Sequence, residues 1–300
     1  IVGFAVTAGV VGKLIDPYSP QVLLQVSAGL SVITALITAL CLGGVEKPVD
    51  AGAMPVQNAA SEHLQKQNFK EAFQEVWAEP AARTFTVFVF MSMLAYSAQD
   101  LILEPFAGAV HGFTPGQTTQ LSGWHHMGVL VGMLAVAGAG SRWVAGRLGS
   151  VQAWMVGGCL VSALATVGLV SSALSVDWPL KANVVFLGVA NGAFSIAAIA
   201  TMMRLAGEGG PGREGTRMGL WGAAQAAAFG LGGLLGTAAS DLAHALLGEQ
   251  RTAYAAVFGM QALMFAVSAA VASRLRTGPA KQRAPLRFDG PVLLKGGSSS

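Results

Sequence analysis

The stretch RTFTVFVFMSMLAYSAQDLILEPFAG, residues 83–108, is long and apolar enough to cross a lipid bilayer as a single helix. It nevertheless carries three polar side chains near its end, Gln99, Asp100 and Glu104. In hydrocarbon a carboxylate costs several kcal/mol unless it is protonated, paired or facing a polar cavity. A membrane helix that keeps two carboxylates four residues apart therefore predicts a polar face with a function.

The composition of the whole chain agrees with a membrane setting. Of its 300 residues 53% are hydrophobic and only 11% are charged, whereas a soluble domain carries about 25% charged residues. So few charges cannot cover a water-facing surface, and the composition predicts an all-α polytopic membrane protein. The net charge of +3 and the lack of a basic-aromatic stripe do not favour a nucleic-acid partner. Cys41 and Cys159 lie in apolar runs without metal-ligand spacing, and we expect them to pack as small apolar side chains.

Apolar runs of about 20 residues mark the membrane helices. One partial and seven full spans are predicted, at residues 1–15 (partial), 21–44, 83–108, 120–140, 151–173, 182–206, 218–239 and 253–274. The first run starts without an initiator Met and already inside an apolar segment, which is expected of the back part of a longer protein.

The spans group into four expected parts. Residues 1–44 would end an N-terminal helix bundle, and 45–82 would form a linker with an amphipathic helix. In that helix the apolar positions are Phe69, Phe73, Val76 and Trp77. Residues 83–274 would form a six-helix bundle, and 275–300 a disordered tail.

Basic residues predict the orientation of the chain in the membrane. If the long linker is cytoplasmic, every Lys and Arg except Lys13, Lys181 and Arg251 lies on the cytoplasmic side, and so does the C-terminus. Two spans, a long cytoplasmic loop and six further spans resemble helices 5 to 12 of the twelve-helix, two-bundle major-facilitator fold. This is a likeness of fold and says little about function.

Several predicted spans carry small residues at every fourth position. Such rows let the backbones of membrane helices approach closely. They are Gly128 and Gly132, Gly188 and Gly192, Gly232 and Gly236, and the row Gly222, Ala226 and Gly230. They indicate either packing within the chain or a surface that docks another membrane protein or a flat pigment.

The depth of the two carboxylates follows from the rise of a helix. Counted from Arg83 at 1.5 Å per residue, Asp100 is expected about 25 Å into the span and Glu104 about 31 Å. At spacing i and i+4 they share one face. Pro105 is expected to loosen the last turn of the helix.

Two adjacent histidines are expected at a similar depth. The next helix is expected to start near Thr119 on the same side of the membrane, and His125 and His126 would then lie about 9–11 Å in. If the two helices are neighbours, the carboxylates and histidines can form one cluster. Asn191 and Gln225, near mid-membrane on their own helices, could line the same cavity or form interhelical hydrogen bonds.

The cluster allows three interpretations. A carboxylate and a histidine could share a proton that drives transport. Alternatively, His125 or His126 could supply an axial nitrogen to a metal, with a carboxylate orienting the ring. A third interpretation is an interfacial carboxylate beside a structurally hydrogen-bonded histidine.

Motifs for soluble catalysis are absent from the sequence. GEGGPG at 207–212 formally reads G-x-G-x-x-G, but it follows a membrane helix and contains Pro211, which is typical of a turn. Neither a Walker A motif nor H-E-x-x-H or C-x-x-C occurs, and no nucleophile stands beside a base. We therefore expect a protein that is not an enzyme.

Two blocks of the sequence resemble the PucC/LhaA family, relatives of the major facilitator superfamily in photosynthetic bacteria. The blocks are AQDLILEPFAGAVHGFTPGQTTQLSGWHHMGVLVGM at 98–133 and GREGTRMGLWGAAQAAAFGLGGLLGTAASD at 212–241. The Q-D-x-x-L-E-P core of the family fits QDLILEP, and TPGQTTQLSG looks closer to the LhaA branch, which is linked to the core antenna. The likeness extends over most of residues 1–275.

The resemblance implies an assembly factor for bacterial light-harvesting complexes. Such a protein would bind bacteriochlorophyll transiently and bring it to newly inserted antenna polypeptides in the inner, intracytoplasmic photosynthetic membrane. Its other implied partners are membrane lipid and reaction-centre or pigment-synthesis proteins. The alternatives are a proton-coupled small-molecule transporter, in which Asp100 or Glu104 titrates, and a scaffold that contacts antenna helices without pigment.

One loop departs from the wider superfamily. Residues 139–150 read AGSRWVAGRLGS, where ordinary members carry G-x-x-x-D-R-x-G-R-R. Gly146 and Arg147 fit this pattern, but Trp143 stands at the Asp position. The missing acid weakens the usual cytoplasmic gate and argues against standard rocking transport.

Overall fold

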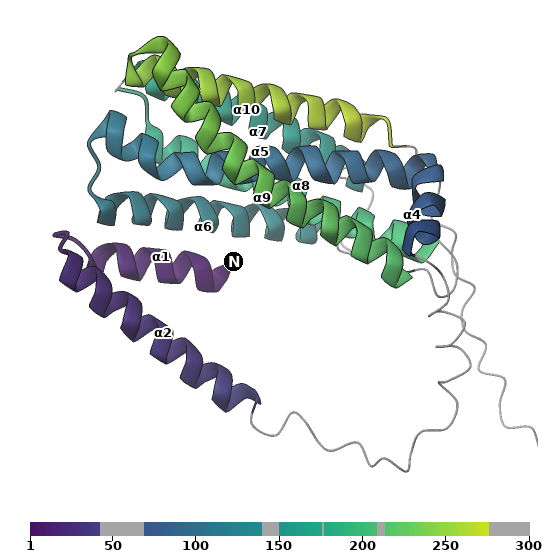
Figure 1. Cartoon of the computed structure of the whole chain (residues 1–300), viewed down its shortest axis with the longest axis horizontal. Coiled ribbons are helices and arrows are strands. Elements are labelled where there is room, and N and C mark those ends of the chain that lie inside the picture. The colour runs from purple at the N-terminus through teal and green to yellow at the C-terminus, as the bar shows by residue number, and fades with distance from the viewer. Residues whose placement is uncertain (43–68, 140–149, 176, 209–213, 276–300) are drawn as a thin grey trace, which may run out of the picture.

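A computed structural model describes residues 1–42, 69–139, 150–175, 177–208 and 214–275, and within these ranges the regular structure is entirely α-helical (Figure 1). The helices are α1 (Val2–Leu14), α2 (Pro20–Leu42), α4 (Phe69–Ala78), α5 (Pro80–His111), α6 (Pro115–Ala139), α7 (Val151–Leu174), α8 (Leu180–Glu208), α9 (Glu214–Leu247) and α10 (Gln250–Ser273).

The described helices confirm the predicted class of a multi-pass, all-α membrane protein. Seven of them, α2 and α5 to α10, are long and apolar enough to cross a bilayer, and α1 is a shorter apolar helix. This agrees with one partial and seven full spans. The loop that contains Trp143, the greater part of the linker, most of the GEGGPG turn and the tail from residue 276 lie outside the described residues.

Several helices are longer than the hydropathy pattern predicts, and α5 shows why. It begins at Pro80, which is favourable in a first turn because proline lacks the N–H that has no partner there. It ends at Gly112, whose φ of 68° is the left-handed conformation that glycine adopts easily. The helix therefore continues from Pro105 to His111, so Pro105 lies inside the helix and not in its last turn as expected. Phe106 is fully buried, so packing holds the helix together beyond the proline.

Helices α5 to α10 form one bundle with two apolar clusters. The cluster nearer to α4 contains Phe85, Trp221 and Phe265, and Val76 of α4 packs into it. The cluster at the other end contains Phe106, Leu169 and Phe258 among others. In Figure 1, α9 crosses obliquely over α5, and the two helices are in contact.

The first two helices differ in how they join this bundle. α1 packs against α6 (Figure 1), where Gly12 and Gly116 let the two backbones approach closely. α2 leads away from the bundle and has no buried residue. The described residues thus form a six-helix bundle with α1 on one side, and α2 presents a free apolar surface.

Candidate functional site

The polar residues of α5 fall on two different sides of the helix. Gln99 is fully buried, whereas Asp100 and Glu104 are half-buried. Consecutive residues point about 100° apart around a helix, so the sequence neighbours Gln99 and Asp100 face different surroundings. Tyr96 lies one turn before Asp100 on the same side and is also half-buried. The polar face predicted from residues 99–104 is therefore two separate features.

Gln99 belongs to a hydrogen-bonded network inside the bundle. Asn191 of α8 donates from Nδ2 to Oε1 of Gln99 at 3.2 Å, and the Ser162 hydroxyl of α7 donates to Oδ1 of Asn191 at 2.7 Å. All three side chains are fully buried. The network joins α5, α7 and α8 through polar contacts. Gln225 is not part of it, because this residue is exposed on α9.

Asp100 and Glu104 face α6. The Ser122 hydroxyl donates a 2.6 Å hydrogen bond to Oε1 of Glu104. Asp100 interacts electrostatically with His126, with Glu104 and with Tyr96. The ion pairs within the described residues join Arg204 to Glu208 and Arg217 to Glu79, so Asp100 and His126 make no direct ion pair.

The two adjacent histidines of α6 have different environments. His125 is fully buried and points toward α8, with Nδ1 3.4 Å from the carbonyl oxygen of Val184 and Nε2 enclosed without a partner. His126 is 8% exposed, and its Nδ1 lies 2.8 Å from the carbonyl oxygen of Ser122. Its ring stacks on Phe4 of α1, with centroids 4.1 Å apart.

These contacts define a polar patch, which we call the Asp100–His126 patch. Its members are Tyr96, Asp100, Glu104, Ser122 and His126. Phe4 lies on the His126 ring, and Phe229 of α9 lies edge-on to Tyr96 at 6.2 Å between centroids. The patch therefore places two carboxylates, a phenol and an imidazole between aromatic side chains, on two helices that are long and apolar enough to cross a bilayer.

Sequence reasoning missed Tyr96, Ser122 and Phe4. The signal for two of them was the helical repeat, because Tyr96 stands four residues before Asp100, and Ser122 four residues before His126. No sequence signal places Phe4 on His126, since that contact depends on how α1 docks against α6.

Within the described ranges, no group of three or more His, Cys, Asp and Glu side chains is placed to hold a metal ion. A metal at the Asp100–His126 patch would therefore need most of its ligands from elsewhere.

The small residues singled out in the sequence fall into two groups. Gly128 and Gly132 of α6 lie directly against α8, and Gly188 and Gly192 of α8 lie directly against α6. In each case an added Cβ would meet a backbone carbonyl oxygen. Gly232 and Gly236 of α9 similarly lie against α5. By contrast, Gly222 and Gly230 have open space in front of them, on the exposed side of α9.

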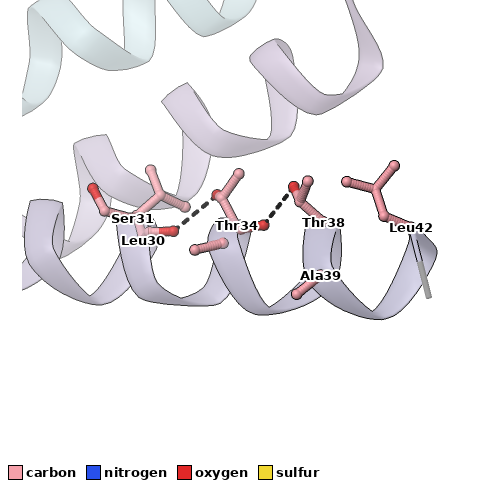
Figure 2. Close-up of a pocket in the computed structure, with 7 residues that line it drawn as sticks. Leu30, Ser31, Thr34, Thr38, Ala39 and Leu42 are labelled. Carbon is pink, nitrogen blue, oxygen red and sulfur yellow. Dashed lines mark hydrogen bonds between the residues drawn. The ribbon is translucent and has the colours of Figure 1, made fainter.

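Two surface hollows lie away from the patch. Figure 2 shows one on α2, with Leu30, Thr34 and Thr38 along a single helix face. The hydroxyls of Thr34 and Thr38 bond to backbone carbonyls of their own helix, so this face offers mainly apolar contacts. The other, of about 380 Å³, lies between α7 and α8 beside Trp154 and Phe186. Neither hollow gathers groups suited to a metal or a proton.

Comparison with known proteins adds to this geometry. The protein-family model described as PUCC protein matches residues 1–279. Three similar proteins come from Rhodobacter capsulatus. The "Bacteriochlorophyll synthase 44.5 kDa chain" is 47% identical over 95% of the present chain. An "Uncharacterized protein in puhA-bchM intergenic region" is 32% identical over 82% of the chain, and "Protein PucC" is 30% identical over 90%.

The matched relatives are longer than the present chain, which spans 64%, 49% and 57% of their respective lengths. The family match nevertheless extends through all the described helices, including α5 and α6 with their polar patch. The resemblance of the Q-D-x-x-L-E-P segment is thus confirmed at the level of the family. The chain belongs to the PucC family of membrane proteins.

Proposed function

We propose that the chain is part of an assembly factor for bacterial light-harvesting complexes, which holds bacteriochlorophyll and passes it to newly inserted antenna polypeptides. The observation that carries the proposal is the Asp100–His126 patch, in which half-buried polar groups of α5 meet buried polar groups of α6, in a chain of the PucC family. Membrane proteins keep ionisable groups at this depth for a function.

The names of two relatives support this assignment. One name contains the word bacteriochlorophyll, and another is PucC. Because the chain covers less than two thirds of either protein, the role of the whole protein is part of the proposal. One of these names also contains the word synthase, but the proposal assigns binding and delivery to the chain and no catalysis.

The surfaces of the chain suit a carrier that meets single-span helices. A large flat pigment needs an apolar binding surface and one polar group that can bind its magnesium. An antenna helix needs a surface that it can approach closely. The open side of α9 at Gly222 and Gly230 and the exposed face of α2 offer such approach. The proposed setting is the photosynthetic inner membrane, with the C-terminus in the cytoplasm.

A proton-coupled transporter is the second candidate, and one observation favours it. Within the described part of the chain Asp100 has neither a hydrogen bond nor a direct ion pair, although it lies beside His126. A carboxylate in this position could take up and release a proton during transport. A scaffold without pigment is a third outcome of the experiment below.

The experiment is an absorption spectrum of the full-length protein, purified in mild detergent from pigment-making cells, together with an assay for antenna polypeptides. A red-shifted bacteriochlorophyll band with co-purifying antenna polypeptides is the expected result. A colourless protein that still retains antenna polypeptides would identify a scaffold. A colourless protein that retains none, but drives proton-dependent uptake into vesicles, would identify a transporter.

A further inference from the structure

We infer that His126, and not its neighbour His125, supplies the axial nitrogen to the magnesium of a bound tetrapyrrole, through Nε2. This inference rests on the proposed function, because it names the ligand atom for the pigment that the protein is proposed to hold. The choice between the two histidines follows from their hydrogen bonds and their burial.

The tautomer of His126 is set by its own helix. Nδ1 lies 2.8 Å from the Ser122 carbonyl oxygen, and a carbonyl can only accept, so the proton must be on Nδ1. The neutral ring then carries its free lone pair on Nε2, the form in which imidazole binds a metal. A backbone carbonyl that holds Nδ1–H is the usual arrangement behind a metal-bound histidine.

The orientation of the His126 ring is also fixed. Phe4 stacks on one face with an interplanar angle of 28°, so the ring plane is held between α1 and the backbone of α6. Nε2 makes no hydrogen bond within the described residues, and it is not among their fully enclosed polar atoms. The lone pair on Nε2 therefore has no partner within the described residues, on a ring that is 8% exposed, and a held ring loses little freedom when it binds.

His125 does not fit the same role. Its ring is fully buried, and the α6 backbone at this residue is in close contact with Gly188 of α8. A macrocycle about 10 Å across could reach its Nε2 only if α6 and α8 separated, and Gly128, Gly132 and Gly192 hold these helices together over several turns. The unpartnered Nε2 of His125 is thus an enclosed acceptor and not an open ligand position.

His244 provides a matched control. Its Nδ1 lies 2.7 Å from the Ser240 carbonyl oxygen, so the same tautomer is set in the same way. Its ring lies edge-on to Tyr254 at 4.9 Å between centroids. However, His244 is in the last turn of α9, away from the Asp100–His126 patch. A general effect of histidine on pigment binding would appear at both positions.

The test is a binding titration of the full-length protein in mild detergent with two probes, bacteriochlorophyll and its magnesium-free form. We expect the parent to bind the magnesium pigment at least about tenfold more tightly. His126→Phe keeps an aromatic ring against Phe4 but removes the nitrogen, and it should abolish this preference. His244→Phe should leave the preference unchanged. In His126→Gly, added imidazole should restore the binding and the absorption band.

The remaining outcomes separate the inference from the proposed function. A parent that binds both probes equally, or a His126→Phe variant that keeps the full preference, overturns the ligand assignment and leaves a pigment carrier. A loss in His126→Gly that imidazole does not reverse also overturns it. A parent that binds neither probe overturns both the ligand and the carrier.

Discussion

Ser122 on α6 donates a 2.6 Å hydrogen bond to Glu104 on α5, whereas Asp100, one turn earlier on the same helix, has no hydrogen-bond partner within the described residues. The two carboxylates on this helix face therefore differ in their hydrogen bonding, and they can have different roles. Glu104 joins two helices, and Asp100 stays available beside His126.

We predict that Asp100→Asn impairs antenna assembly more than Glu104→Gln. The amide oxygen of Gln can still accept the hydrogen bond from Ser122, so this change should cost no more than about 1 kcal/mol. Asp100→Asn removes the carboxyl group that lies beside His126, and we expect pigment retention to fall by about tenfold, or about 1.4 kcal/mol. The measurement is the amount of antenna complex and bound pigment in membranes that contain equal amounts of each variant. Equal or reversed effects would contradict this division of roles.

A second prediction concerns the close contact of α6 and α8. In Gly192→Ala the added methyl group would meet the carbonyl oxygen of Val129, so the helices must separate at a cost of about 1–3 kcal/mol. Gly222→Ala is the matched control, because nothing lies within 4 Å of its added methyl group. Thermal unfolding in mild detergent should show a lower midpoint for Gly192→Ala alone. Because alanine favours the helix more than glycine does, helix propensity alone should raise the midpoint of both variants, and an equal change in both would contradict the role of the α6–α8 contact.

The third prediction concerns Arg217, which ties three helices together at the α4 end of the bundle. Its guanidinium donates to the carbonyl oxygen of Leu205 at 2.8 Å and forms an ion pair with Glu79, the residue before α5. Arg217→Met should lower the free energy of unfolding by about 1–3 kcal/mol, because it leaves the Leu205 carbonyl oxygen and the Glu79 carboxylate without these hydrogen bonds.

Arg204→Met is the control for Arg217→Met. Arg204 pairs with Glu208 at 3.7 Å on the same helix, with side-chain exposures of 33% and 45%, and such pairs contribute about 0.3–0.5 kcal/mol. Denaturant titration in detergent measures both variants. If Arg217→Met is as stable as Arg204→Met, the contacts of Arg217 with Leu205 and Glu79 do not stabilise the bundle as proposed.

Much of the fold was predictable because each apolar segment must satisfy its own backbone hydrogen bonds in lipid, whatever the other segments do. A run of about 20 apolar residues is driven into a helix by the lack of water, whatever its neighbours are. The seven full spans could therefore be found one at a time from the sequence. Helix ends were less predictable: α5 continues past its apolar run until Gly112 caps it, and α9 extends beyond its apolar run at both ends.

The candidate site was only partly predictable. The sequence alone indicated that Asp100 and Glu104 share a face and that histidines lie at a similar depth, because both statements follow from the rise and repeat of one helix. Of the two possibilities for Asn191 and Gln225, a shared cavity or interhelical hydrogen bonds, the second is confirmed for Asn191 alone. Asn191 bonds to Gln99 in the core, and Gln225 is exposed on α9.

The class of protein, the spans and the polar residues that each span carries could be found without the tertiary structure, since these depend on local hydropathy and helical geometry. Helix packing set the rest: Gln99 faces α8 while Asp100 faces the patch, and Nε2 of His125 is enclosed while His126, itself only 8% exposed, lies at the patch. The physical reason is that adjacent residues point about 100° apart on a helix, so their environments depend on which helices pack on each side. That packing comes from contacts between distant segments, such as Gly188 against the backbone of His125 and Phe4 against the ring of His126.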